Sequence, residues 1–133
     1  MQYVQLMDCL APDSIRRPLI DTAFGLNYST GTATGPVTAK IASYTILPSE
    51  YGKAFSNYLA GTSVTFTLPT AYAGAMLWIV KLTTTQDVVV DGAGSDTING
   101  AATLTNATSE IGGLLLIGIS ATQWLAFKIG TWA

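Results

Sequence analysis

The chain has 133 residues, a formal net charge of −2 and no histidine. This length suits one domain with a single hydrophobic core. Charged residues make up 11% of the chain, against ~25% in an ordinary soluble domain, and there is no basic stripe to hold a phosphate backbone, so direct nucleic-acid binding is not expected. Thr, Ser, Asn and Gly must cover much of the surface, or apolar surface must face other subunits, and we expect both.

Residues 1–36 are expected to form an irregular N-terminal arm, which ends in the Gly/Thr/Ser linker NYSTGTATGP. Disordered tails avoid apolar side chains at this density, so the arm is expected to lie against a surface. Two alternatives remain, of which the second is favoured: the arm packs on its own domain, or it docks on a neighbouring subunit or another protein. Its candidate contact residues are apolar or aromatic: Tyr3, Val4, Leu6, Met7, Leu10, Ile15, Leu19, Ile20 and Phe24.

Neither a secretory signal nor a membrane span is expected. Asp8 and Asp13 fall where a signal peptide would be apolar. The longest strongly apolar run, residues 111–119, is about half of the ~20 residues that a spanning helix needs. We therefore expect synthesis in the cytoplasm and no membrane partner.

From Val37 to the end at Ala133 the apolar residues recur with a period of two, which predicts a β-module. The clearest strand is Ser63–Pro69, with Val64, Phe66 and Leu68 on one face. Turn signals every eight to twelve residues favour an all-β fold, a small antiparallel β-sandwich or barrel-like module. The other expected strands are 76–82, 87–90, 102–105, 114–119 and 123–129.

Residues 49–59 leave two interpretations open. Tyr51, Phe55 and Tyr58 lie at helical spacing behind a capping Ser49. The segment is short and contains Gly52, however. We favour a turn over residues 48–52 followed by a strand.

The stretch VVVDGAGSDTING, residues 88–100, resembles one turn of the nonapeptide repeat of calcium-binding β-helices. Such a site needs tandem repeats, because one turn supplies too few oxygen ligands, and residues 99–107 do not repeat the pattern. The segments Asp91-Gly92, Gly94 and Asn99-Gly100 are instead typical of tight turns with positive φ. We predict a turn without a metal ion.

No enzymatic activity is expected. The chain lacks histidine, the commonest general base, and Cys9 stands alone, so a zinc site, a Cys–His pair and an intrachain disulfide are all excluded. Paired carboxylates, a G-x-S-x-G elbow and a phosphate-binding loop are missing as well. The sequence predicts no catalytic, cofactor-binding or metal-binding residues.

Taken in order, several segments resemble the small β-modules of bacteriophage virion proteins found in head fibres, capsid decoration proteins and tail fibres. These segments are YTILPSEYGKAF, TSVTFTLPTAYAG, VVVDGAGSDTING and the closing ATQWLAFKIGTWA. The resemblance covers about residues 44–133. It implies a homotrimeric, non-enzymatic structural module on a phage particle.

The three tryptophans Trp78, Trp124 and Trp132 are candidate trimer contacts, since tryptophan is enriched at the centres of interfaces. The alternative is that Trp78 and Trp124 fill the core of their own subunit. Trp132 lies one residue from the end of the sequence. Its burial would require contacts that hold the C-terminal residues in place.

Two functions follow as expectations. In the first, favoured one, the protein decorates or cements the capsid, or forms a head fibre, with the arm bound to the major capsid protein and the module as a homotrimer on the virion surface. In the second, a tail-fibre module binds host carbohydrate or another receptor. Sugar binding needs aromatic platforms beside hydrogen-bonding groups, and the candidates are Tyr44, Tyr51, Tyr58, Tyr72 and Asn57.

Overall fold

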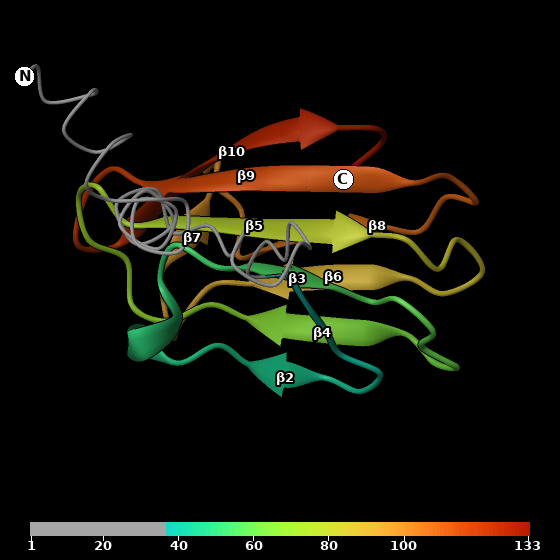
Figure 1. Ribbon diagram of the computed structural model, residues 1–133. Helices are drawn as coiled ribbons and strands as arrows, with labels where there is room; N and C mark the ends of the chain where they lie inside the picture. Colours follow the sequence, from blue (N-terminus) through green and yellow to red (C-terminus); the bar gives the residue numbers. More distant parts are fainter. Residues whose placement is uncertain (1–36) are drawn as a thin grey trace, which may run out of the picture. The chain divides into compact units, whose positions relative to one another are not determined.

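The computed structural model describes residues 37–133, so the expected contacts of the arm lie outside the described residues. The described chain is almost entirely β-structure, in a six-stranded and a four-stranded sheet (Figure 1). In spatial order the six-stranded sheet contains β1 (Val37–Ala39), β3 (Ala54–Ser56), β5 (Met76–Lys81), β9 (Gly112–Gly118), β10 (Gln123–Ile129) and β7 (Thr97–Ile98). The four-stranded sheet contains β2 (Tyr44–Thr45), β4 (Val64–Thr67), β6 (Val88–Asp91) and β8 (Thr103–Asn106).

The first six strands form a coil that passes alternately through the two sheets. β1, β3 and β5 pair in parallel in one sheet, and β2, β4 and β6 pair in parallel in the other. The chain therefore runs in opposite directions in the two layers, as the arrows of β4 and β5 show in Figure 1. The second turn of the coil takes 24 residues, since Ala54 pairs with Trp78 and Val64 with Val88. This arrangement is a short solenoid.

The predicted all-β class is correct. The predicted antiparallel sandwich or barrel is wrong, because the first six strands pair in parallel as a solenoid. Antiparallel pairs occur only in the last part of the described chain, where β8 pairs with β6 and β9 pairs with both β5 and β10. The turns between the first six strands carry the chain to the opposite sheet, so none of these strands pairs with the one that follows it in sequence.

Most local predictions agree with the backbone. A 3₁₀ turn, η1 (Pro48–Glu50), precedes strand β3, so residues 49–59 are a turn and a strand rather than a helix. The calcium-like stretch consists of strands β6 and β7 with a turn after each, and φ is positive at Gly94, Asn99 and Gly100 as predicted but not at Asp91 or Gly92. Asn99 tolerates this conformation better than most side chains do.

The hydrophobic core lies between the two sheets. Val64, Phe66 and Leu68 alternate inward as predicted and are fully buried or nearly so. Phe66 meets Phe55 of the opposite sheet with ring centroids 6.1 Å apart. The buried Asn57 joins successive turns of the coil, because its Oδ1 accepts from the backbone N–H of Leu82 and Thr83 and its Nδ2 donates to the Thr83 carbonyl.

Candidate interaction surface

The three strands β5, β9 and β10 of the six-stranded sheet are mainly apolar on both of their faces. Along β5, Leu77 and Ile79 point into the core and are fully buried, whereas the intervening Met76 and Trp78 are 43% and 39% exposed. β10 repeats the pattern, with buried Trp124 and Ala126 between exposed neighbours. A sheet with one solvated face normally alternates apolar with polar residues. Apart from Gln123 at the start of β10, the outer face of these strands lacks such polar residues.

Strand register aligns these outer residues into rows. Trp78 pairs with Leu115, which pairs with Phe127, and Met76 is aligned in the same way with Ile117 and Leu125. Side chains directly opposite on one face lie about 4.5–5.5 Å apart at Cβ, so each row is continuous. We call this surface the apolar face; its residues in β5, β9 and β10 are Met76, Trp78, Val80, Leu115, Ile117, Leu125, Phe127 and Ile129.

The apolar face is large for a single chain. At side-chain areas on the order of 150–250 Å², the five most exposed residues (Met76, Trp78, Leu125, Phe127 and Ile129) present on the order of 500 Å² of apolar surface. Just beyond the strand ends the same alternation reaches Leu82, Ile111 and Ile119, which are 40%, 63% and 51% exposed. With these residues and Val37 of β1, the area approaches the ~800 Å² that each partner buries in a standard protein interface.

Two positions at the sheet edges are already paired within the subunit. Next to β7, which pairs with the start of β10, the Asn99 side chain accepts from Ala126 N–H at 2.9 Å and donates to the Ala126 carbonyl at 3.0 Å, so it continues the pairing along β10. In the four-stranded sheet, the C-terminal Ala133 exchanges two backbone hydrogen bonds with Thr105 of β8. Exposed strand edges invite pairing with other chains, and both of these positions are occupied within the subunit.

The three tryptophans predicted as trimer contacts do not lie together. Trp124 and Trp132 are 1% and 5% exposed and belong to the core. Their own chain covers them, so they are not available to a neighbouring subunit. Only Trp78 has the exposure that such a contact needs, and it lies at the centre of the apolar face.

A buried polar cluster joins β5 of one sheet to β8 of the other. The Lys81 ammonium group is fully buried, and it donates to the Asn106 carbonyl at 3.0 Å, to Asn106 Oδ1 at 3.3 Å and to the Thr108 carbonyl. Separate contacts hold Trp132, since its Nε1 donates to the Ile129 carbonyl at 3.0 Å and the adjacent Ala133 pairs with Thr105. Sequence alone does not indicate the Lys81 cluster, since an isolated lysine in an apolar strand gives no sign of its partners.

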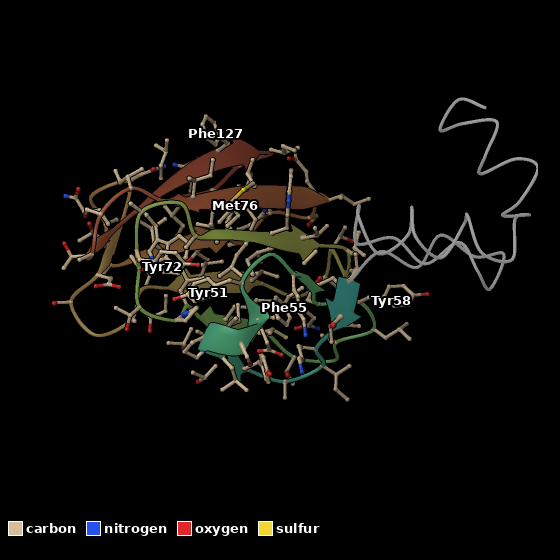
Figure 2. The ribbon with its side chains drawn as sticks, turned by 60° about the vertical axis from the view of Figure 1, so that its left-hand side comes forward. Tyr51, Phe55, Tyr58, Tyr72, Met76 and Phe127 are labelled. Atoms are coloured by element: carbon tan, nitrogen blue, oxygen red, sulfur yellow. The ribbon has the colours of Figure 1, made fainter. Side chains whose placement is uncertain are left out.

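The residues proposed for carbohydrate binding are dispersed. Tyr51 and Tyr72 lie side by side with ring centroids 4.8 Å apart, whereas Tyr58 lies at the opposite end of the module (Figure 2). The Tyr51 hydroxyl donates to the Thr70 carbonyl, and its pKa is raised by burial. Asn57 is fully buried, with its side chain committed to the coil. These groups do not form one platform.

Tyr44 belongs to a separate surface group. Its hydroxyl donates to both carboxylate oxygens of Glu50, at 3.0 and 2.9 Å, and this hydrogen bond raises the pKa of the phenol. The Leu47 N–H donates to Glu50 and lowers the pKa of that carboxyl. The Lys40 ammonium lies 3.5 Å from the centroid of the Tyr44 ring. Together these contacts anchor η1 against β2.

Within residues 37–133, no three His, Cys, Asp or Glu side chains lie close enough together to hold a metal ion. Nor does this part of the chain contain a helix of the length and apolarity needed to cross a membrane. The buried Asp96 is used structurally, since its Oδ2 accepts from Ala71 N–H at 2.8 Å. The apolar face is therefore the feature of the described chain that calls for a functional explanation.

No model of a known protein family matches the chain, and no curated protein is significantly similar to it.

Proposed function

We propose that this protein is a non-enzymatic structural component of a bacteriophage-type virion, which decorates or cements the capsid or forms a head fibre. The observation that carries the proposal is the apolar face of the six-stranded sheet, with Trp78 and Phe127 39% and 53% exposed near its centre. The largest apolar patch on a typical monomer is ~300–600 Å², and the apolar face with its extension to Leu82, Ile111, Ile119 and Val37 approaches ~800 Å². A protein built to work in an assembly keeps such a face covered.

Two further observations support a virion. The order of segments in residues 44–133 resembles the β-modules of phage head fibres and decoration proteins. The arm, residues 1–36, is rich in apolar residues and ends in a Gly/Thr/Ser linker, which suits attachment to the major capsid protein. In this proposal the module is a homotrimer on the capsid surface, and three linked arms strengthen one another's binding through effective concentration.

The alternative, a receptor-binding tail-fibre module, has less support. A sugar site needs several aromatic and hydrogen-bonding groups in one place. Tyr58 lies far from the pair of Tyr51 and Tyr72, and the hydroxyls of Tyr44 and Tyr51 already have partners within the chain.

Deleting residues 1–25 tests whether the arm supplies attachment to the capsid and the module supplies oligomerisation. The truncated protein is expected to keep the number of subunits of the full-length oligomer and to lose binding to capsid shells, because the three arms supply the attachment. The measurement is cosedimentation of each protein with purified shells, with the native mass determined in parallel. Truncated protein that still decorates shells as the full chain does would overturn the role of the arm.

A further inference from the structure

We propose that the apolar face packs against the apolar faces of the other copies of this chain around the three-fold axis of the trimer. This inference rests on the proposed function and deepens it, because it names the surface and the partner through which the subunits assemble. Its centre is the row of Trp78, Leu115 and Phe127 across β5, β9 and β10.

The chemistry of the face favours a copy of itself as its occupant. No charged side chain lies among its residues in β5, β9 and β10, because both lysines of these strands alternate to the other face of the sheet: Lys81 is fully buried, and Lys128 donates to the Trp132 carbonyl. Interfaces of permanent homo-oligomers are the more apolar class and resemble a core cut in half. A face with no charge and few hydrogen-bonding groups fits an equally apolar surface, and an identical face meets that requirement.

The arm is a poorer occupant of this face. Its first 26 residues carry five charged side chains. Burying such groups without partners is costly, and the apolar face offers them no opposite charge. The charged residues of the arm are Asp8, Asp13, Arg16, Arg17 and Asp21.

Two positions at the sheet edges are closed to a strand from another chain. Asn99, next to β7, occupies both backbone groups of Ala126 in β10, and Ala133 occupies those of Thr105 in β8. The proposed contact therefore uses the face of the sheet rather than these edges. Packed sheets interdigitate their side chains, which would enclose Phe127 and Trp78 between copies.

Phe127→Gln is the test variant, and Leu47→Gln is its matched control. The two side chains are 53% and 51% exposed, but Leu47 lies beside η1, away from the apolar face. Sedimentation velocity of the full-length proteins over a range of concentrations measures self-association. We expect the wild type and Leu47→Gln to be oligomeric, and Phe127→Gln to raise the dissociation constant on the order of 30-fold, the effect of losing a central contact residue.

Acrylamide quenching of tryptophan fluorescence provides a second readout that does not depend on mass. Trp78 is the one tryptophan of the described chain exposed in the single subunit. It should be protected in the wild type and become accessible in Phe127→Gln, while Trp124 and Trp132 stay protected in both. Circular dichroism confirms that each variant is folded, and the double variant Leu125→Gln/Phe127→Gln strengthens the effect if one substitution is too mild.

The possible outcomes distinguish failure of this inference from failure of the proposed function. An oligomer unaffected by the double variant would overturn the inference, as would a wild type that remains monomeric at all concentrations. A monomeric full chain that becomes oligomeric on deletion of residues 1–25 would show that the arm is the occupant, again contrary to the inference. Face-dependent oligomers that never bind capsid shells would support the inference and contradict the proposed function.

Discussion

Replacing Trp132 with alanine is expected to lower the free energy of unfolding by about 3–5 kcal/mol, the usual cost of truncating a buried tryptophan. The side chain is 5% exposed although it is next to the end of the chain. It is held there by the hydrogen bond from its Nε1 to the Ile129 carbonyl and by the pairing of Ala133 with Thr105. Loss of the indole leaves a cavity at one end of the core and frees the final residues.

Urea unfolding followed by circular dichroism measures this effect, with Phe127→Gln as the common background so that self-association does not contribute to stability. Trp132→Phe is the control. It keeps most of the apolar volume and loses the Nε1 donor, so we expect it to cost about 1 kcal/mol. A Trp132→Ala protein within 1 kcal/mol of its parent would show that the C-terminal segment does not close the core.

Replacing Lys81 with methionine is expected to destabilise the fold by about 2–4 kcal/mol. Methionine follows the lysine side chain as far as Cε and lacks only the ammonium group, so it removes the donor to the carbonyls of Asn106 and Thr108. Buried polar groups left without partners each cost on the order of 1–3 kcal/mol. The lysine thus stabilises the fold through hydrogen bonds to neutral oxygens at the junction of the two sheets.

Lys128→Met is the matched control for this substitution. Lys128 is exposed, and its ammonium donates to the Trp132 carbonyl at 3.2 Å. We expect its replacement to change the free energy of unfolding by less than 1 kcal/mol, as for most surface substitutions. Equal effects of the two substitutions in thermal and urea unfolding would contradict a special role for the buried ammonium of Lys81.

The strands were predictable from sequence because their signals are local. Alternation of apolar and polar residues placed Val64, Phe66 and Leu68 on a buried face, and Gly94 and Asn99-Gly100 indicated turns with positive φ. The connections were not predictable in the same way. Gly, Asn and Ser residues are typical both of a turn that forms a hairpin and of a turn that carries the chain to an opposite sheet. The difference appears only in the strand pairing, where Val64 pairs with Val88, 24 residues later, rather than with a residue of the next strand in sequence.

The apolar face was visible in sequence only as an excess of apolar residues. The runs MLWIVKL and QWLAFKI show no polar alternation, which is typical of strands covered on both faces. They do not reveal which alternate residues face the core. The emphasis on tryptophan therefore selected the buried Trp124 and missed its neighbours on the outer face, Leu125 and Phe127.

Light scattering of the purified protein, with and without residues 1–25, gives the number of chains in each particle. We expect three chains in both proteins, each chain of the full-length form contributing 13.9 kDa, because the module assembles and the arm attaches. A dimer in both would retain a contact between apolar faces but would rule out the trimer. A monomer in both would leave the apolar face without a partner and would rule out assembly through it.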